Sequence, residues 1–212
     1  MNKDIFYQTV KPFSMTSEER INGLFESLEY VRKNNIIGDI VECGVWKGGN
    51  ILGIIEYLEY YKIYDKNVWV YDTFKGMTLP SSKDIDHNGN IASDIINEVM
   101  CYSPIEEVKQ TLSLSKFKND NIKIIEGDVC LTLKLKYNLP SEISILRLDT
   151  DFYESTKIEM DILYPLLVKN GVLIVDDYGH WEGSKLAINE YFKNYSVTIN
   201  KLDYTGIKII KE

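Results

Sequence analysis

The stretch Ile143-Ser144-Ile145-Leu146-Arg147-Leu148-Asp149-Thr150-Asp151 decides the fold, because it is an apolar run that closes on acidic residues. Such a run predicts a buried β-strand with its acids at the carboxyl end. Four more runs share this form: they cover residues 40–42, 68–72, 122–128 and 172–176 and close on Glu42, Asp72, Asp128 and Asp176. The carboxyl ends of parallel strands open onto one rim of a sheet, where ligands bind in open α/β folds. Five such acids therefore predict a functional site at that rim.

Segments with helical periodicity separate these strands. We expect helices at about 16–34, 49–61, 105–116, 158–166 and 183–194, and residues 91–100 fit a short helix. Thr16 and Glu19 fit a capping box for the first helix, and Gly171 stands where the helix before the fifth strand should stop. The chain closes on a hairpin-like pair, 197–199 and 206–210. This alternation predicts an α/β fold with a doubly wound, mostly parallel sheet and an antiparallel C-terminal edge.

The length of 212 residues predicts one domain over 1–212, with two segments of distinct character. Residues 1–15 lack a clear period and are expected to form an irregular arm. Residues 75–104 are rich in Gly, Pro, Ser and Asp. A segment this long without periodicity is typical of a lid or a substrate-binding insertion.

Bulk composition argues against several partner classes. The net charge of −8, from 24 basic and 32 acidic residues, disfavours nucleic acid and anionic membranes as partners. No apolar run approaches the ~18 residues of a membrane-spanning helix, so no membrane insertion is expected. The start of the chain lacks the basic and apolar pattern of a signal peptide. The three cysteines fit no metal-binding spacing, and reduced thiols in a cytoplasmic protein are the simplest interpretation.

The first strand leads into a glycine-rich turn, Glu42-Cys43-Gly44-Val45-Trp46-Lys47-Gly48-Gly49-Asn50. Its glycines allow close approach of a ligand, and the helix that follows offers free N–H groups. The spacing is neither the dinucleotide fingerprint nor a phosphate loop, so a tight turn without a ligand stays equally open. Asp72, about 30 residues after Glu42, is placed to accept hydrogen bonds from ribose hydroxyls, and together with the turn it favours a nucleoside. Asp128 fits either an adenine contact or an ordinary turn residue.

Asp149, Asp176 and Asp177 form the sharpest set. Hard divalent cations such as Mg²⁺ take oxygen ligands and keep positions for water or substrate. Neighbouring carboxylates without a counter-charge would repel one another and raise each other's pKa values. Arg147 offers one counter-charge, although a structural ion pair explains it as well. The cluster therefore predicts a divalent-cation site.

In these residues the sequence is similar to the macrocin O-methyltransferase family of sugar O-methyltransferases. The matching stretches cover the chain from about 14 to 192, and they read Gly38-Asp39-Ile40-Val41-Glu42-Cys43-Gly44-Val45-Trp46-Lys47-Gly48-Gly49, Tyr71-Asp72-Thr73-Phe74-Lys75-Gly76-Met77, Leu146-Arg147-Leu148-Asp149-Thr150-Asp151-Phe152-Tyr153-Glu154-Ser155-Thr156 and Val175-Asp176-Asp177-Tyr178-Gly179. The resemblance implies a Rossmann-like class I methyltransferase with a seven-stranded sheet. It also implies S-adenosyl-L-methionine and Mg²⁺ as cofactors, a hydroxyl of a small molecule or glycan as acceptor, and a homodimer or larger oligomer.

The resemblance assigns roles to individual residues. Asp151 matches the general base, and Asp149, Asp176 and Asp177 match the Mg²⁺ ligands. Asp72 matches the ribose-binding acid, and the other positions expected to bind the cofactor are Glu42, Gly44, Asn50, Thr73 and, more weakly, Asp128. Lys75 stands where many relatives carry an acid, which puts the role of that position in doubt. Residues 75–104 align poorly, and that segment would shape the acceptor pocket.

Two other enzyme classes compete for the acidic motif. A metal-dependent glycosyltransferase uses an Asp-x-Asp site, which Asp149-Thr150-Asp151 would supply, but this leaves Asp72, the glycine turn and the Asp176-Asp177 pair unexplained. In a phosphatase of the haloacid-dehalogenase type the motif should close the first strand, not the fourth. A non-enzymatic nucleoside-binding module explains none of the clustered acids. The identity of the acceptor is not readable from the chain.

Overall fold

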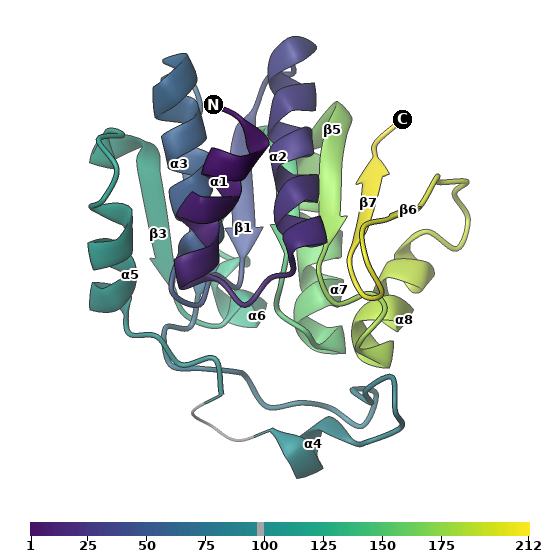
Figure 1. Cartoon of the computed structure of the whole chain (residues 1–212). Coiled ribbons are helices and arrows are strands. Elements are labelled where there is room, and N and C mark those ends of the chain that lie inside the picture. Colours follow the sequence, from purple (N-terminus) through teal and green to yellow (C-terminus); the bar gives the residue numbers. More distant parts are fainter. Residues whose placement is uncertain (97–99) are drawn as a thin grey trace.

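The computed structural model describes residues 1–96 and 100–212 and is built around a sheet with the strand order β3-β2-β1-β4-β5-β7-β6 (Figure 1). The strands are β1 (Asp39–Cys43), β2 (Val68–Asp72), β3 (Ile122–Glu126), β4 (Ile143–Leu148), β5 (Leu167–Val175), β6 (Asn200–Lys201) and β7 (Ile207–Ile210). Strands β1 to β5 pair in parallel, and β7 runs antiparallel to both β5 and β6. The predicted class, a mostly parallel α/β sheet with an antiparallel C-terminal edge, is confirmed.

The register of the sheet brings the carboxyl ends of the central strands to one level. Cys43 at the end of β1 lies opposite Tyr71 of β2 and Leu148 of β4, and Leu148 lies opposite Val175 of β5. The residues that follow these positions, including Asp72, Asp149 and Asp176, therefore leave the sheet side by side. The chain order reverses between β1 and β4, which is the switch point where open α/β sheets form their ligand crevice.

Helices cover both faces of the sheet and bury two apolar cores (Figure 1). One face carries α1 (Lys3–Val10), α2 (Glu18–Lys33), α3 (Gly49–Tyr61) and α5 (Ile105–Leu112). The other carries α6 (Val129–Thr132), α7 (Tyr153–Ile162) and α8 (Glu182–Tyr191). Alternate side chains of one strand serve opposite cores, as Ile40 and Val41 of β1 do. Among the described residues, no helix is long and apolar enough to cross a membrane.

The expectation that residues 1–15 are irregular is wrong. They form α1 and the 3₁₀ turn Lys11–Phe13, with Phe6 and Val10 fully buried against α3. Close approach is possible because α3 presents glycines: a Cβ on Gly53 would lie 2.4 Å from Val10 Cγ2, and one on Gly49 would lie 2.6 Å from the carbonyl oxygen of Phe13. The docked segment leads residues 14–16 to the rim of the sheet.

Several element boundaries also differ from the predictions. The cap of α2 is Ser17, whose side chain accepts from Arg20 N, and not Thr16. Pro165 ends the helical stretch in a 3₁₀ turn, Tyr164–Leu166, so that β5 starts at Leu167 and Gly171 lies inside the strand. Helix α5 ends at Leu112 rather than near 116, and the first strand of the hairpin is Asn200–Lys201 instead of 197–199. Two further 3₁₀ turns cover Asn119–Asn121 and Lys136–Asn138.

We call residues 75–104 the cap, and its described parts, 75–96 and 100–104, cross below the carboxyl rim of the sheet (Figure 1). Of the expected helix at 91–100, α4 (Ala92–Ile95) is present, and residues 97–99 lie outside the described part. Buried Asp84 anchors the cap by accepting hydrogen bonds from Ser81 N and Oγ and from Tyr153 N at the start of α7. Ile85 O accepts a hydrogen bond from Glu182 N, where α8 begins, and this bond is a second tether of the cap.

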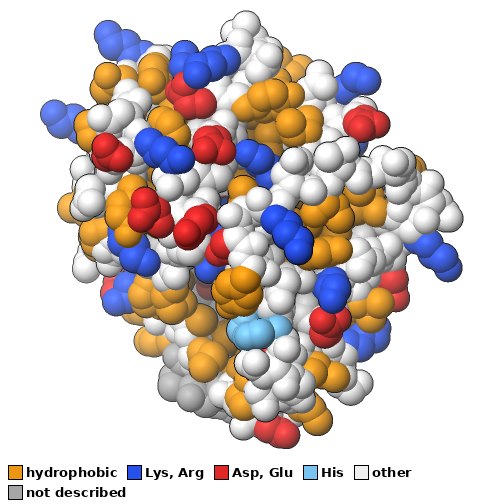
Figure 2. Space-filling view, turned by 45° about the vertical axis from the view of Figure 1, so that its right-hand side comes forward, with side chains coloured by type: hydrophobic (Ala, Val, Ile, Leu, Met, Phe, Trp, Pro, Cys, Tyr) orange, Lys and Arg blue, Asp and Glu red, His pale blue; other side chains and the backbone are white. Residues whose placement is uncertain are grey.

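Charge on the outside of the molecule is mixed. On the face shown in Figure 2, basic and acidic side chains are interspersed around apolar patches. Two histidines meet where the cap contacts the loop after β5, because the rings of His87 and His180 lie 4.8 Å apart between centroids. This contact adds a third link between the cap and the body of the protein.

Candidate active site

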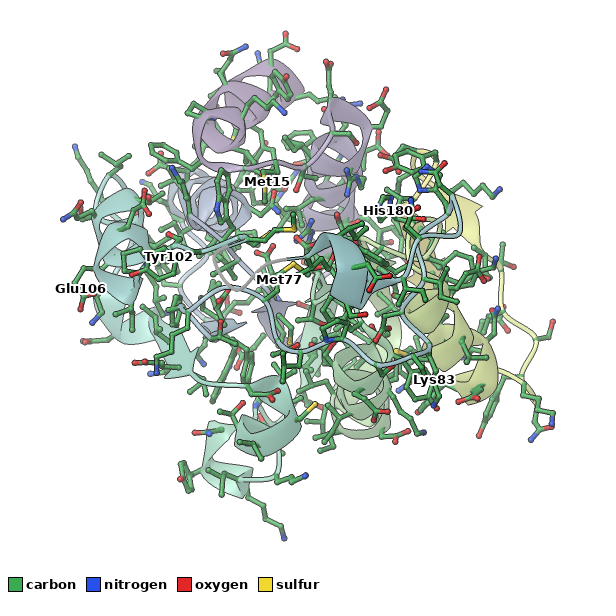
Figure 3. The ribbon with its side chains drawn as sticks, turned by 90° about the horizontal axis from the view of Figure 1, so that it is seen from below. Met15, Met77, Lys83, Tyr102, Glu106 and His180 are labelled. Atoms are coloured by element: carbon green, nitrogen blue, oxygen red, sulfur yellow. The ribbon has the colours of Figure 1, made fainter. Side chains whose placement is uncertain are left out.

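A cavity opens at the switch point between β1 and β4 and collects residues from distant parts of the chain. Its walls include the segment before α2, the glycine turn after β1, the ends of β2, β4 and β5, the turn after β3, and the cap. Seen from below, Met15 of the first segment and Met77 of the cap lie near each other over the middle of the sheet, and both line the cavity (Figure 3). The predicted rim site is thus a real hollow, bounded on one side by the cap.

The glycine turn after β1 owes part of its composition to packing. Gly44 has a φ of +79°, and a Cβ there would lie only 1.9 Å from the carbonyl oxygen of Asp149, so no side chain fits. Trp46 is also left-handed, with a φ of 47°. Gly44, Val45 and Trp46 line the cavity. The glycine at 44 is required by the neighbouring strand end, whether or not a ligand approaches it.

Glu42 and Asn50 form a buried pair at the start of α3. Glu42 is fully buried and does not line the cavity, whereas Asn50 does. Asn50 Nδ2 donates to Glu42 Oε1 over 3.1 Å. Glu42 Oε2 and Asn50 Oδ1 have no hydrogen-bond partner among the described residues. Burial raises the pKa of Glu42 to about 7. The pair therefore offers spare acceptor atoms beside the cavity.

Asp72 is held by backbone amides. Its Oδ2 accepts from Val45 N (2.7 Å) and Trp46 N (3.2 Å), and its Oδ1 accepts from Phe74 N (2.8 Å). Burial nevertheless raises its pKa. The carboxylate lines the cavity and keeps one lone pair beyond these three bonds. Thr73 also lines the cavity, with Oγ1 donating to Gly76 O.

Asp128 lies differently from the other predicted cofactor residues. Its side chain caps α6 by accepting from Cys130 N over 2.8 Å. The flanking residues Gly127 and Val129 line the main cavity, while Asp128 borders a neighbouring hollow beside the cap. The structure thus gives Asp128 the turn-and-cap role that the sequence left open, and does not bring it to the main cavity.

Asp149, Asp176 and Asp177 converge on one point. One carboxylate oxygen from each lies within 4.8 Å of the other two. Asp177 Oδ2 is buried and has no partner among the described residues. Burial raises the pKa of Asp177 well above its usual value and that of Asp176 to about 6. An all-oxygen set with an unsatisfied atom fits a hard divalent cation.

Two arginines balance this acidic set. Fully buried Arg147 donates to Glu42, to Asp149 Oδ2 (2.7 Å) and to Asp176, so it is both counter-charge and ion-pair partner. Arg20 of α2 donates to Asp176 through Nη1 and to Asp203 through Nε. The sequence reasoning missed Arg20. A signal was available, because a basic residue in the first turn of a helix opposes the helix dipole.

Asp151 adopts a left-handed backbone conformation, with a φ of 66°, and lines the cavity beside the acidic set. Its Oδ1 accepts a hydrogen bond from Trp181 Nε1 over 2.9 Å. Burial and then the charge of Asp149 raise the pKa of Asp151 to about 7. Trp181 is a second residue that the sequence reasoning missed.

Glu159 of α7 supports this loop from behind. It is fully buried and accepts from Thr150 Oγ1 at both oxygens, over 3.0 and 3.1 Å. Burial raises its pKa to about 8. Glu159 therefore anchors the residue between Asp149 and Asp151.

Comparisons with known proteins agree on one kind of enzyme. Residues 8–210 match the family model described as macrocin-O-methyltransferase (TylF). Demethyldecarbamoylnovobiocin O-methyltransferase of Streptomyces niveus is 29% identical over 188 residues, which are 87% of this chain and 69% of that protein. A 4'-O-methyltransferase of Streptomyces olivaceus, named for 8-demethyl-8-(2,3-dimethoxy-alpha-L-rhamnosyl)-tetracenomycin C, is 28% identical over 92% of this chain and 74% of its own length. The structure of the O-methyltransferase NovP superposes with a TM-score of 0.82 at 26% identity and covers 94% of this chain and 82% of NovP.

Proposed function

We propose, from the premise that this chain belongs to the macrocin-O-methyltransferase family and is an O-methyltransferase, that it methylates a hydroxyl of a glycosyl group. In this proposal S-adenosyl-L-methionine is the methyl donor, and Mg²⁺ binds at Asp149, Asp176 and Asp177. The observation that carries the proposal is the convergence of these three carboxylates beside Asp151 in one cavity. The rhamnosyl group in the name of one relative supports a sugar acceptor.

The cofactor would lie along the β1–β2 side of the cavity. Asp72 keeps one lone pair that would accept a hydrogen bond from a ribose hydroxyl. Asn50 Oδ1, which has no partner among the described residues, would accept from the amino group of the methionine part, and Glu42 holds Asn50 in place from behind. S-adenosylmethionine supplies an electrophilic methyl group on a sulfonium centre. The acidic surroundings favour this positively charged ligand.

The acidic set serves the acceptor side. A divalent cation supplies Lewis acidity that makes a hydroxyl easier to deprotonate. Asp151 takes the proton that the hydroxyl gives up. Its pKa of about 7, raised by burial and by Asp149, suits a base that works near neutral pH. Arg147 and Arg20 keep the surrounding carboxylates close together despite their mutual repulsion.

The proposal extends to the organisation of the chain. Residues 1–212 act as one methyltransferase domain, and the cap shapes the acceptor pocket. A cytosolic location is supported by three free cysteines, which suit a reducing compartment. The alternative of a glycosyltransferase is not supported by the matches.

The decisive experiment combines binding with turnover. S-adenosylhomocysteine and a nucleotide sugar are titrated calorimetrically, and a panel of sugar acceptors is incubated with methyl-labelled S-adenosylmethionine, with Mg²⁺ or with EDTA. We expect S-adenosylhomocysteine to bind and labelled product to form only with the cation. Asp149→Ala should lose the cation-dependent turnover and keep its affinity for S-adenosylhomocysteine. Turnover that is insensitive to EDTA would refute the role of the metal, and binding of the nucleotide sugar alone would refute the proposal.

A further inference from the structure

We propose that Trp181 is a positioning residue: its indole N–H fixes the carboxylate of Asp151, and its ring links that carboxylate to the docked cap. This inference rests on the proposed function, in which Asp151 receives the proton of the acceptor. Nothing in the sequence motif around Asp176-Asp177 points to Trp181. The assignment comes from four contacts of its side chain and backbone.

The first contact is the hydrogen bond to Asp151. Trp181 lies at the N-terminal cap position of α8, and its side chain is buried. Nε1 donates to Asp151 Oδ1 over 2.9 Å, which leaves Oδ2 to take a proton. The indole ring packs edge-on against Phe152, the residue that follows Asp151, with 5.6 Å between the ring centroids. Both the carboxylate and the backbone after it are thus held by one side chain.

Trp181 differs in kind from the donors that hold the neighbouring acids. Asp149 and Asp176 are bonded by guanidinium groups, which carry a positive charge. Asp151 is bonded by an indole, which is a neutral donor with no acceptor atom. Asp149, Asp151, Asp176 and Asp177 line the same cavity, and like charges repel one another. A directional donor such as the indole N–H therefore keeps the Asp151 carboxylate in one orientation beside its acidic neighbours.

The remaining contacts tie Trp181 to the cap. Trp181 and Phe152 share a small buried cluster with Ala92 of the cap, and Met77 and Ile96 of the cap pack against it. Asp86 of the cap also pairs with Trp181 in an isolated β-bridge. The first turn of α8 has no spare room beside the cap, because a Cβ on Gly183 would lie 1.9 Å from Asp84 Oδ1. Displacement of the cap therefore displaces the indole, and with it the base.

Nuclear magnetic resonance tests the hydrogen bond without any turnover. The chain has three tryptophans, and ¹⁵N labelling gives three indole N–H signals, which Trp181→Phe assigns. We expect Asp151→Asn to shift the Trp181 signal and to leave the Trp69 signal in place. Trp69 is a matched control, because its Nε1 donates to Asp39 Oδ2 over 2.8 Å in the same way. Asp39→Asn should shift the Trp69 signal alone. If the Trp181 signal does not shift in Asp151→Asn, the inference is overturned.

Kinetics then separate positioning from simple structural support. Trp181→Phe keeps the ring packing and removes the donor, so we expect kcat to fall roughly 10- to 100-fold, with little change in KM or in the affinity for S-adenosylhomocysteine. In the Asp151→Asn background the same change should cost nothing further. A folded Trp181→Phe protein that keeps the kcat of the unmodified protein would overturn the inference. The inference would also be overturned if Trp181→Phe lowered kcat in the Asp151→Asn background by the same factor as in the unmodified protein.

A separate variant, Gly183→Ala, tests the link between Trp181 and the cap. Alanine is otherwise favourable inside a helix, so Gly183→Ala perturbs chiefly through its clash with Asp84. We expect it to shift the Trp181 signal and lower kcat, and an unchanged signal would overturn the link. If Asp151→Asn itself keeps the unmodified rate, the proposed base is wrong and the kinetic part of the inference falls with it. The hydrogen-bond measurement distinguishes that outcome from a failure of Trp181 alone.

Discussion

Apart from Glu42 of β1, which Arg147 bonds, the two halves of the cavity rim hold their acids by different means. On the β1–β2 side, three backbone amides bond Asp72, and nearby Asp128 caps α6 through another backbone amide. On the β4–β5 side, arginine side chains bond Asp149 and Asp176, while one oxygen of Asp177 has no partner among the described residues.

This difference separates permanent from exchangeable partners. Backbone amides come with the fold and stay where the fold puts them, so Asp72 is a fixed feature of its half. Side-chain cations can be supplemented or replaced by a metal ion, and an unpartnered buried carboxylate costs stability until something binds it. The β4–β5 half thus has the arrangement expected of the proposed cation site. The following predictions test that contrast.

The largest effect is expected for Asp177→Asn. Removal of one carboxylate of the acidic set should lower cation-dependent methyl transfer by roughly 1000-fold or more, because several kcal/mol of charge stabilisation are lost. Without a cation, the same variant should unfold at a higher temperature than the unmodified protein, since an unpartnered buried carboxylate is removed. Calorimetry with Mn²⁺ and thermal melts measure both effects. Asp128→Asn is the control that should leave cation binding intact. If cation-free Asp177→Asn melts at a lower temperature than the cation-free unmodified protein, the contrast between the two halves is wrong.

Asp72→Asn should act on the other half. The variant replaces a carboxylate that accepts hydrogen bonds from three backbone amides. We expect S-adenosylhomocysteine to bind roughly 10- to 100-fold more weakly, and the free energy of unfolding to fall by about 1–3 kcal/mol. Neither loss should respond to Mg²⁺. Titration calorimetry and urea unfolding check this expectation. Recovery of stability on addition of Mg²⁺ would show that the two halves are not independent.

Arg20→Leu tests whether a metal ion can take the place of an arginine beside Asp176. The variant should melt at a lower temperature without a cation, because Asp176 loses a charged partner. Mg²⁺ should then raise its melting temperature more than it raises that of the unmodified protein, by about 2–4 °C for each 1 kcal/mol regained. Arg32→Leu is a matched control in the same helix, since Arg32 pairs with Glu29 away from the cavity. An equal Mg²⁺ response in all three proteins would contradict exchange at Asp176.

The smallest effect concerns pH. Burial raises the pKa of Glu159 from 4.5 to about 8, so the folded state keeps a proton that the unfolded chain releases. The stability that comes from this proton is fully present below about pH 4.5 and is lost as the pH rises through about 8. Glu159→Gln keeps an acceptor for Thr150 and should flatten this part of the pH profile, measured by urea unfolding at several pH values. An unchanged profile would show that Glu159 is not the titrating group.

The sequence was sufficient for the sheet and for the meeting of the acids, because both follow from local patterns. Each apolar run with a terminal acid became a strand or its end, and the parallel register then brought Asp72, Asp149 and Asp176 to one level. Asp177 follows Asp176 directly and comes with it. These positions depend on strand period and topology, which the sequence encodes locally.

The parts that could not be predicted depend on contacts between distant segments. Arg20 and Asp176 are 156 positions apart, and Trp181 and Asp151 are 30 apart, so no local spacing indicates either pair. Helix α1 has only two fully buried side chains, and its docking depends on Gly53 and Gly49 of α3, of which only Gly49 belongs to the glycine-rich turn that the sequence analysis considered. Gly44 is a similar case: its absent side chain suggested room for a ligand, whereas the carbonyl of Asp149 excludes any side chain there.

Buried Arg147 has a consequence for the way such a sequence can diverge. It bonds Glu42 of β1, Asp149 after β4 and Asp176 after β5, so the three acids share one guanidinium. Loss of one acid leaves the guanidinium with two carboxylate partners, but loss of Arg147 alone strands three carboxylates, at a cost of several kcal/mol. We therefore expect the arginine to be replaced only in sequences in which its acids are replaced as well.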